Sequence, residues 1–435
     1  MMGIGDWGLE IGSRQSPVPS RQSPVASRQY PTQRPSPVPN LLLLTGIIGL
    51  VYLSIGLSSP LITLYLKDLG ASYWQISLIL TSFSATALLS NYAWGWVSDR
   101  FGRRKPILLV GLLGLAVAYW QLSRVPDANI AWSIRVLEGV AAAAYATPSL
   151  ALMGDLLAGT GQRGRRMGFY RGSASMMFAV GAFFGGALAD RASIPVVLSV
   201  CAAVYLTAAF FTLFVREIPP AQKVVAVETP QTPPSPTTAE RQLPWLFLLG
   251  AMLWTAAHGA GASMWPNYMA SFDYTKTEIT RLWSLAALVE FPSMAVAGMA
   301  SDIFGRAPLL FAGGAFAAIV HIGYVTLAAL LPALLVIQVI RGFAFGSFTT
   351  TGMTFVADWG GQQRRGRNSG VYNAANGAGG LIGTFLGGTI VQLLGFGSLY
   401  TVCALFAAGS AIAFLLLRRQ QQKKKDEALT KVGVY

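Results

Sequence analysis

Four charged residues stand inside long apolar stretches of the sequence, where a charge is costly. They are Arg135, Glu138, Glu290 and Arg341. Ionisable side chains inside membrane spans are rare, and they mark substrate paths, ion paths or proton relays. These four residues are therefore candidates for binding a polar solute or for carrying a proton.

Two of these charges belong to a polar face of one predicted helix. Its members at helical spacing are Arg135, Glu138, Ala142, Tyr145 and Ser149. An equivalent face in the second half of the chain carries Arg341 at the position that matches Glu138. We expect these two opposite charges to face each other across a cavity and to pair, directly or through substrate. The alternative is that Glu138 pairs only with Arg135, three residues earlier in its own helix.

Glu290 lies well inside another apolar stretch, with no basic residue close to it in the sequence. Because an unpaired charge is costly in lipid, this carboxyl group suits a role in taking up and releasing a proton. A structural carboxyl group bonded to a neighbouring helix is the alternative.

Aromatic and amide side chains in two other stretches extend the candidate site. Trp254, His258 and Trp265 share one helix face that can stack on an aromatic or sugar ring. Packing in the core explains that face equally well. Asn373 and Asn376 are candidate polar ligands, although hydrogen bonding between helices is the simpler account. We expect His321 to be structural.

Membrane-spanning helices are needed to position these side chains. The chain has 435 residues, of which 53% are hydrophobic and 11% are charged, whereas a soluble domain carries about 25% charged residues. Apolar stretches of about 20 residues, long enough to cross a bilayer, recur along it. Backbone groups in lipid must be satisfied within each segment, so these stretches should be helices. We predict an all-α polytopic membrane protein with twelve spans, over residues 41–65, 73–97, 106–124, 129–156, 167–189, 194–215, 244–270, 278–300, 307–328, 331–357, 369–393 and 397–417.

Proline-rich segments divide the chain into five predicted parts. These are a disordered cytoplasmic tail (1–40), a six-helix bundle (41–215), a cytoplasmic linker (216–243), a second six-helix bundle (244–417) and a basic cytoplasmic tail (418–435). With both termini inside, 25 Lys and Arg residues fall on the cytoplasmic side and five on the other. The positive-inside rule therefore predicts cytoplasmic termini, and we expect the cell membrane as the location.

The two halves of the sequence repeat at an offset of 202–203 residues. Glycines and charges keep this register along most of the chain, and even Cys201 matches Cys403. Two halves with the same orientation are related by an axis along the membrane normal. That relation predicts a cavity between the halves near the middle of the membrane.

The segment Gly95-Trp-Val-Ser-Asp99-Arg-Phe-Gly102-Arg103-Arg104 resembles the loop signature of the major facilitator superfamily of transporters. A weaker copy, Gly298-Met-Ala-Ser-Asp302-Ile-Phe-Gly305-Arg306, follows at the same offset and lacks counterparts of Arg100 and Arg104. The resemblance covers nearly the whole chain. It implies two pseudo-symmetric six-helix bundles that alternate in exposing a central site.

Charged residues in and near these loops can form ion pairs between helix ends. Arg103 and Arg104 can reach Asp155 at the end of the fourth predicted helix, and by the repeat Arg306 can reach Asp358. The resemblance implies that these pairs hold the outward-open state and break as the halves move. A plain topology anchor is the alternative.

Three further segments resemble different subfamilies. The segment Arg135-Val-Leu-Glu138-Gly139 resembles a motif of drug-transporting members. The segment from Gly181 to Gly186 resembles the antiporter motif, but Ala182 stands where that motif has proline. The segment around Glu290 resembles sugar- and aromatic-acid-permease-like members. These resemblances differ, so neither the substrate nor the direction of coupling follows from them.

We expect a secondary transporter of a small organic solute, coupled to protons and similar to drug-efflux members. The alternatives are proton-coupled uptake of a sugar, nucleoside or organic acid, and a non-transporting membrane receptor or scaffold. The sequence carries no P-loop, metal-ligand cluster or nucleophile motif, so we expect no cofactor, no metal and no enzymatic activity. No basic groove with interleaved aromatic residues points to nucleic acid, and we expect a monomer in the bilayer.

Overall fold

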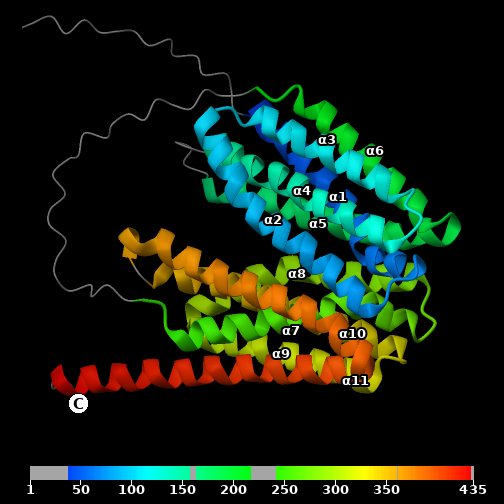
Figure 1. The fold of residues 1–435 in the computed structure, drawn as a ribbon. Coiled ribbons are helices and arrows are strands. Elements are labelled where there is room, and N and C mark those ends of the chain that lie inside the picture. The colour runs from blue at the N-terminus through cyan, green and yellow to red at the C-terminus, as the bar shows by residue number, and fades with distance from the viewer. Residues whose placement is uncertain (1–37, 157–162, 217–241, 360, 433–435) are drawn as a thin grey trace, which may run out of the picture. The chain divides into compact units, whose positions relative to one another are not determined.

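The computed structural model describes residues 38–156, 163–216, 242–359 and 361–432. The N-terminal bundle is formed by helices α1 (Val38–Asp68), α2 (Tyr73–Phe101), α3 (Lys105–Leu122), α4 (Ala128–Leu156), α5 (Arg163–Arg191) and α6 (Ile194–Thr212) (Figure 1). The C-terminal bundle is formed by α7 (Trp245–Ala270), α8 (Lys276–Phe304), α9 (Arg306–Leu327), α10 (Leu331–Asp358) and α11 (Gly361–Val432).

The long element α11 contains two of the twelve predicted spans. Gly395 interrupts it with a φ of 82°, a left-handed conformation that glycine adopts without strain. The part after Gly395 continues as a helix past the apolar stretch to Val432. Most of the predicted tail, 1–40, and of the predicted linker, 216–243, lies outside the described residues.

Local sequence explains where several helices begin. Ser72 precedes α2 and its hydroxyl accepts a hydrogen bond from the Gln75 backbone N–H. Thr275 precedes α8 and forms a reciprocal capping box with Glu278.

Large apolar side chains are exposed along α3, α6 and α9, for example Val117, Phe210 and Ile322. Exposed apolar surface on helices of this length is expected to face lipid.

Helix packing repeats between the two bundles. In the N-terminal bundle α1 packs on α5 and α6, and α4 packs on α2 and α3; in the C-terminal bundle α7 and α9 pack on α11, and α10 packs on α8 and α9. The bundles meet mainly where α5 packs on α8 and where α11 packs on α2. The internal repeat of the sequence thus corresponds to a repeat of contacts.

Close helix crossings occur at equivalent glycines. A methyl group on Gly139 of α4 would lie 2.7 Å from the Phe83 carbonyl oxygen of α2, and one on Gly342 of α10 would lie 2.8 Å from the Ala286 carbonyl oxygen of α8. Small residues permit this approach of helix backbones in membranes. Gly95 and its copy Gly298 in the loop motifs are not at such close crossings, because both have room for a methyl group.

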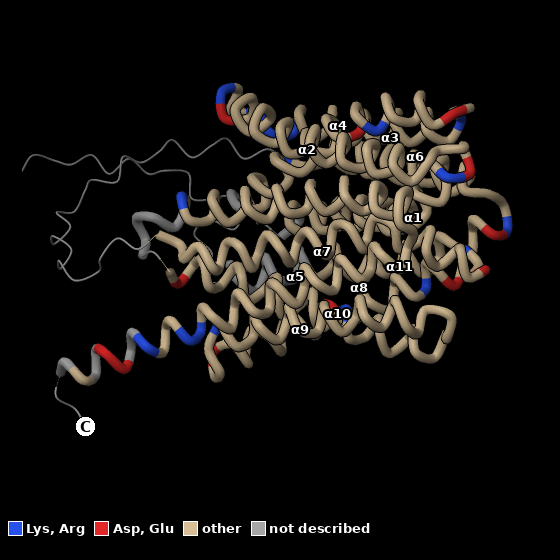
Figure 2. The backbone as a smooth tube through the Cα atoms, turned by 60° about the horizontal axis from the view of Figure 1, so that its bottom comes forward, with Lys and Arg blue, Asp and Glu red and all other residues tan. Residues whose placement is uncertain are grey.

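Charged residues gather toward the two ends of the helices (Figure 2). We call one end the Asp190 end, where α5 ends and α8 begins, and the other the Arg306 end, where α8 ends and α9 begins. Eleven helices of the described chain are long and apolar enough to cross a membrane, with two spans in α11. The charges within the spans are therefore the exceptions that a functional site must explain.

Candidate functional site

Arg135 and Glu138 form a buried ion pair within α4. Arg135 Nη1 lies 2.5 Å from Glu138 Oε2, and the two side chains are 7% and 4% exposed. The guanidinium also lies over the Phe83 ring of α2, 4.2 Å from its centre. Residues three apart share a helix face, so this pairing needs no second helix.

Arg341 of α10 has different partners from those we expected. Its Nη1 donates a hydrogen bond of 3.3 Å to Gln338 Oε1, and its guanidinium lies 4.6 Å from the centre of the Trp283 ring. The structure does not bring Glu138 and Arg341 into direct contact, and Glu138 pairs within its own helix. The predicted helix face is correct, but each charge is held inside its own bundle.

A small cavity lies within the C-terminal bundle, between α7, α9 and α10. Its polar and aromatic walls include Trp254, His258, Trp265, His321, Arg341 and Phe345. His258 stacks on Trp254 with ring centres 5.1 Å apart, and Trp254 stacks in turn on Phe348. The residues of this α7 stripe therefore pack against one another and also line the cavity.

Glu290 lies on α8 close to the crossing with α10. It makes no hydrogen bond or ion pair with any residue that the structure describes, and Arg341 lies within electrostatic range of its carboxyl group. Gly342, next to Arg341, packs on Val289, next to Glu290. Arg341 is 51 residues from Glu290 in the sequence, and the two were not predicted from the sequence to lie together.

Other predicted site residues lie apart from the cavity. Tyr145 is 7% exposed inside the N-terminal bundle. On α11, Asn373 is exposed and Asn376 is half-buried. The structure therefore does not assemble the predicted residues into a single site; it places the charges in two clusters, one in each bundle.

Each loop motif contains a glycine that ends a helix. Gly102 ends α2 with a φ of 61°, and Gly305 ends α8 with a φ of 89°, which explains the glycine in both copies. Asp99 and Arg103 are exposed, and Arg100 stacks on Trp96. The side chain of Asp155, the predicted partner of Arg103 and Arg104, lies outside the described residues.

The second loop motif holds a charge cluster at the Arg306 end. Arg306 Nε lies 3.1 Å from Asp358 Oδ2 and Arg306 Nη1 lies 2.6 Å from Asp302 Oδ1. Arg306 also donates a hydrogen bond to the Ser301 hydroxyl. The predicted Arg306–Asp358 pair is thus present, and it joins the ends of α8, α9 and α10.

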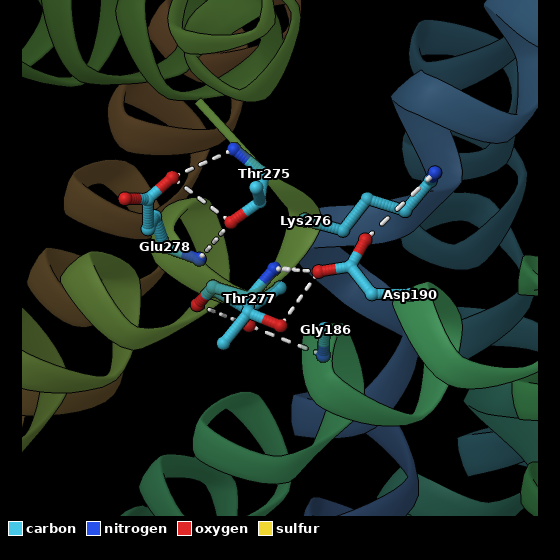
Figure 3. A network of polar contacts seen from close by, with 7 residues as sticks. Gly186, Asp190, Thr275, Lys276, Thr277 and Glu278 are labelled. Carbon is cyan, nitrogen blue, oxygen red and sulfur yellow. Dashed lines mark hydrogen bonds and ion pairs between the residues drawn. The ribbon is translucent and has the colours of Figure 1, made fainter. Parts of the chain in front are cut away.

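The two bundles are joined at the Asp190 end by a polar network that Figure 3 shows. Asp190 Oδ2 of α5 accepts hydrogen bonds from the Thr277 backbone N–H, at 2.8 Å, and from the Thr277 hydroxyl, at 2.6 Å. Lys276 Nζ lies 4.0 Å from Asp190 Oδ1. A carboxylate from one bundle therefore caps the N-terminus of α8 in the other, where a negative charge is favoured.

An equivalent contact joins the bundles between α11 and α2. Gln392 Oε1 accepts a hydrogen bond of 3.1 Å from the Tyr73 backbone N–H. In both contacts the backbone N–H of a glycine donates a hydrogen bond to a hydroxyl group of the other bundle. Gly186 of α5 donates to Thr280 of α8, and Gly388 of α11 donates to Ser77 of α2. We call these two contacts together the inter-bundle contact.

Sequence reasoning missed most of the inter-bundle contact. Asp190 stands beside Arg191 in the sequence, whereas in the structure it binds Thr277 and Lys276 of the other bundle. We also expected His321 to be only structural, whereas it lines the cavity with His258. The available signal was the match of Gly186 to Gly388 in the repeat, which did not by itself say what those glycines touch.

Comparison with known proteins decides the family. A profile of the Major Facilitator Superfamily matches residues 44–330 and 246–433. The chain belongs to the Major Facilitator Superfamily. Members of this superfamily are transporters and not enzymes, so the expectation of a membrane transporter of a small solute is confirmed.

Two relatives are similar in sequence. A Deinococcus radiodurans protein with the provisional name of a sugar efflux transporter is 27% identical over 380 residues, which cover 84% of this chain and 95% of that protein. The puromycin resistance protein pur8 of Streptomyces alboniger is 36% identical over 128 residues, which cover 28% of this chain and 24% of that protein.

Solved structures confirm the superfamily fold. The nucleoside transporter NupG superposes with a TM-score of 0.71 at 16% identity, over 87% of this chain and 98% of that chain. A bacterial homolog of the human lysosomal transporter Spinster superposes with a TM-score of 0.74 at 14% identity, over 89% of this chain and 98% of that chain. At these identities the likeness concerns the fold alone.

Proposed function

We propose that this chain exchanges protons for a small organic solute and thereby exports the solute. Glu290 is the observation that carries this proposal. A carboxyl group within a span, without a hydrogen bond or ion pair among the described residues, has no structural partner that would fix its charge. Arg341 lies within electrostatic range, on the wall of the cavity, so the charge of Glu290 influences the groups that meet a solute there.

Export is supported by the names of the two relatives, one of which refers to sugar efflux and the other to puromycin resistance. We further propose that the Arg306 end faces the cytoplasm, because the excess of Lys and Arg lies on that side. The inter-bundle contact lies at the end of the helices opposite to the Arg306 cluster, so it joins the two bundles on the side that faces away from the cytoplasm in this proposal.

Proton-coupled uptake of a sugar, nucleoside or organic acid is the second candidate function. Ala182 of α5 stands where the antiporter motif has proline, and it is fully buried. Gly181 and Gly185 on either side of it pack against the backbone of α1. A tightly packed α5 without that proline favours symport over exchange.

Solute accumulation in proteoliposomes with an imposed pH gradient tests the proposal. A panel of sugars, aminonucleoside drugs, nucleosides and aromatic acids is presented outside. Exchange predicts accumulation when the lumen is more acidic than the bath, and symport predicts accumulation when the lumen is more alkaline. Glu290→Gln should uncouple accumulation from the gradient, whereas Glu427→Gln, an exposed acid on the last turns of α11, should not. Accumulation by the wild type that ignores the gradient contradicts proton coupling.

A further inference from the structure

The only two histidines of the chain line the same cavity in the C-terminal bundle. His321 is 7% exposed, and its Nδ1 atom is buried without a hydrogen-bond partner among the described residues. His258 makes ring contacts with Trp254 and Phe345 but no hydrogen bond within the described chain. Buried polar atoms are nearly always hydrogen-bonded, so this wall retains unused capacity for a ligand.

The residues that line this cavity include one arginine and no acidic side chain, and Glu290 lies within electrostatic range of Arg341 without lining the cavity. The guanidinium of Arg341 is always ionised, and no acidic side chain in the described ranges contacts it directly. Gln338 presents its oxygen to Arg341 and to the Tyr324 hydroxyl, which leaves its fully buried Nε2 donor without a partner in the described structure. A guanidinium and an amide donor beside two imidazoles disfavour a cation and favour an anion.

The equivalent place in the N-terminal bundle already contains an anion. By the repeat, Gln338 matches Arg135, Arg341 matches Glu138, and His321 matches Tyr119. In the N-terminal bundle the Glu138 carboxylate neutralises the arginine at 2.5 Å. In the C-terminal bundle the arginine is present and the contacting carboxylate is missing.

The size of the cavity limits what can supply that missing charge. It offers about 30 Å³ of space to water-sized molecules, which is enough for a few heavy atoms and not for a whole organic solute. We propose that the cavity binds one small monovalent anionic group, held by Arg341 and His321, with Gln338 positioning the guanidinium of Arg341. A free halide and the carboxylate end of a larger solute both have this chemistry. The proposal goes beyond proton-coupled export and does not depend on its direction.

Thermal unfolding of the purified protein in nanodiscs tests the proposal without any transport. The unfolding midpoint is followed at constant ionic strength while isethionate, a bulky anion, is replaced by chloride, bromide, acetate or benzoate. Binding to the native state alone raises the midpoint in a saturable way. Arg341→Gln should weaken this binding by at least about tenfold, the loss expected for one charged hydrogen-bond donor. His321→Phe keeps the ring contacts and removes the nitrogen atoms, so it should weaken binding even if Arg341→Gln fails to fold.

The matched control is Arg124→Gln. Arg124 also stacks on a tryptophan, with its guanidinium 4.3 Å from the centre of the Trp120 ring, but it lies outside the cavity. It should retain the full response to anions. A response to halides alone identifies a free ion, and a response to acetate and benzoate alone identifies the carboxylate of a solute. A wild-type midpoint that ignores every anion, or an undiminished response in both cavity variants, overturns the proposal whether or not the chain transports protons.

Discussion

Asp190→Ala should open the Asp190 end of the transporter. The carboxylate accepts two hydrogen bonds from Thr277, at 2.8 and 2.6 Å. A hydrogen bond to a charged group contributes about 1.5–3 kcal/mol. Because the Asp190 side chain is 30% exposed, we discount the pair of bonds to about 2 kcal/mol in total. That loss changes the ratio of closed to open molecules by about 30-fold.

Distances between spin labels on the two bundles measure this opening. Ala192 after α5 and Ala270 at the end of α7 are exposed, and they belong to different bundles at the same end. A wild type that is open in about one molecule in a hundred would become open in about one in four. Asp190→Asn keeps an acceptor without the charge, so its open fraction should be intermediate.

Asp127→Ala is the matched control. Asp127 also caps a helix at this end, since its Oδ1 accepts hydrogen bonds from the backbone N–H groups of Asn129 and Ile130. Those bonds stay within the N-terminal bundle. The reasoning is refuted if Asp190→Ala leaves the distances unchanged, or if Asp127→Ala opens the same end equally.

Three further predictions follow from single contacts. Gly186→Ala places a methyl group against the Lys276 carbonyl oxygen and should separate α5 from α8 in the same distance measurement. Gly397→Ala is the control, because a methyl group there meets no atom within 4 Å and should change no distance. Equal effects of the two variants would contradict the packing argument. Glu138→Gln leaves Arg135 buried without a countercharge and should cost about 3 kcal/mol of stability in thermal unfolding. The double variant Arg135→Met, Glu138→Met should recover much of that stability. An unchanged unfolding midpoint for Glu138→Gln would show that the pair is not a structural unit. Cys201 and Cys403 are fully buried, so thiol reagents should label them only upon unfolding; fast labelling of the folded protein would contradict the packing of α6 and α11.

The fold could be predicted because its causes are local. Apolar stretches of membrane length must become helices, and the repeat of glycines at equivalent positions fixes how each bundle repeats the other. The helix signals act within single segments, and the repeat adds the correspondence between the two halves of the chain.

The site was less predictable because its contacts join distant segments. Arg135 and Glu138 share a face of α4, and they form an ion pair with each other. Glu138 therefore does not pair with a residue of a second helix. Arg341 approaches Glu290 only because Gly342 allows α10 to cross α8 closely. His321 was assigned a structural role from the usual position of its helix, and nothing in the sequence placed it opposite His258.

The pH inside sealed proteoliposomes tests the central claim, proton-coupled transport, most directly. A fluorescent proton reporter is enclosed with the wild type or with Glu290→Gln, and the solutes that accumulate are added outside. Exchange predicts that the lumen becomes more alkaline as the solute enters, and that Glu290→Gln abolishes the change. Acidification of the lumen would contradict export by exchange in favour of symport. Solute entry without any change in pH would contradict proton coupling itself.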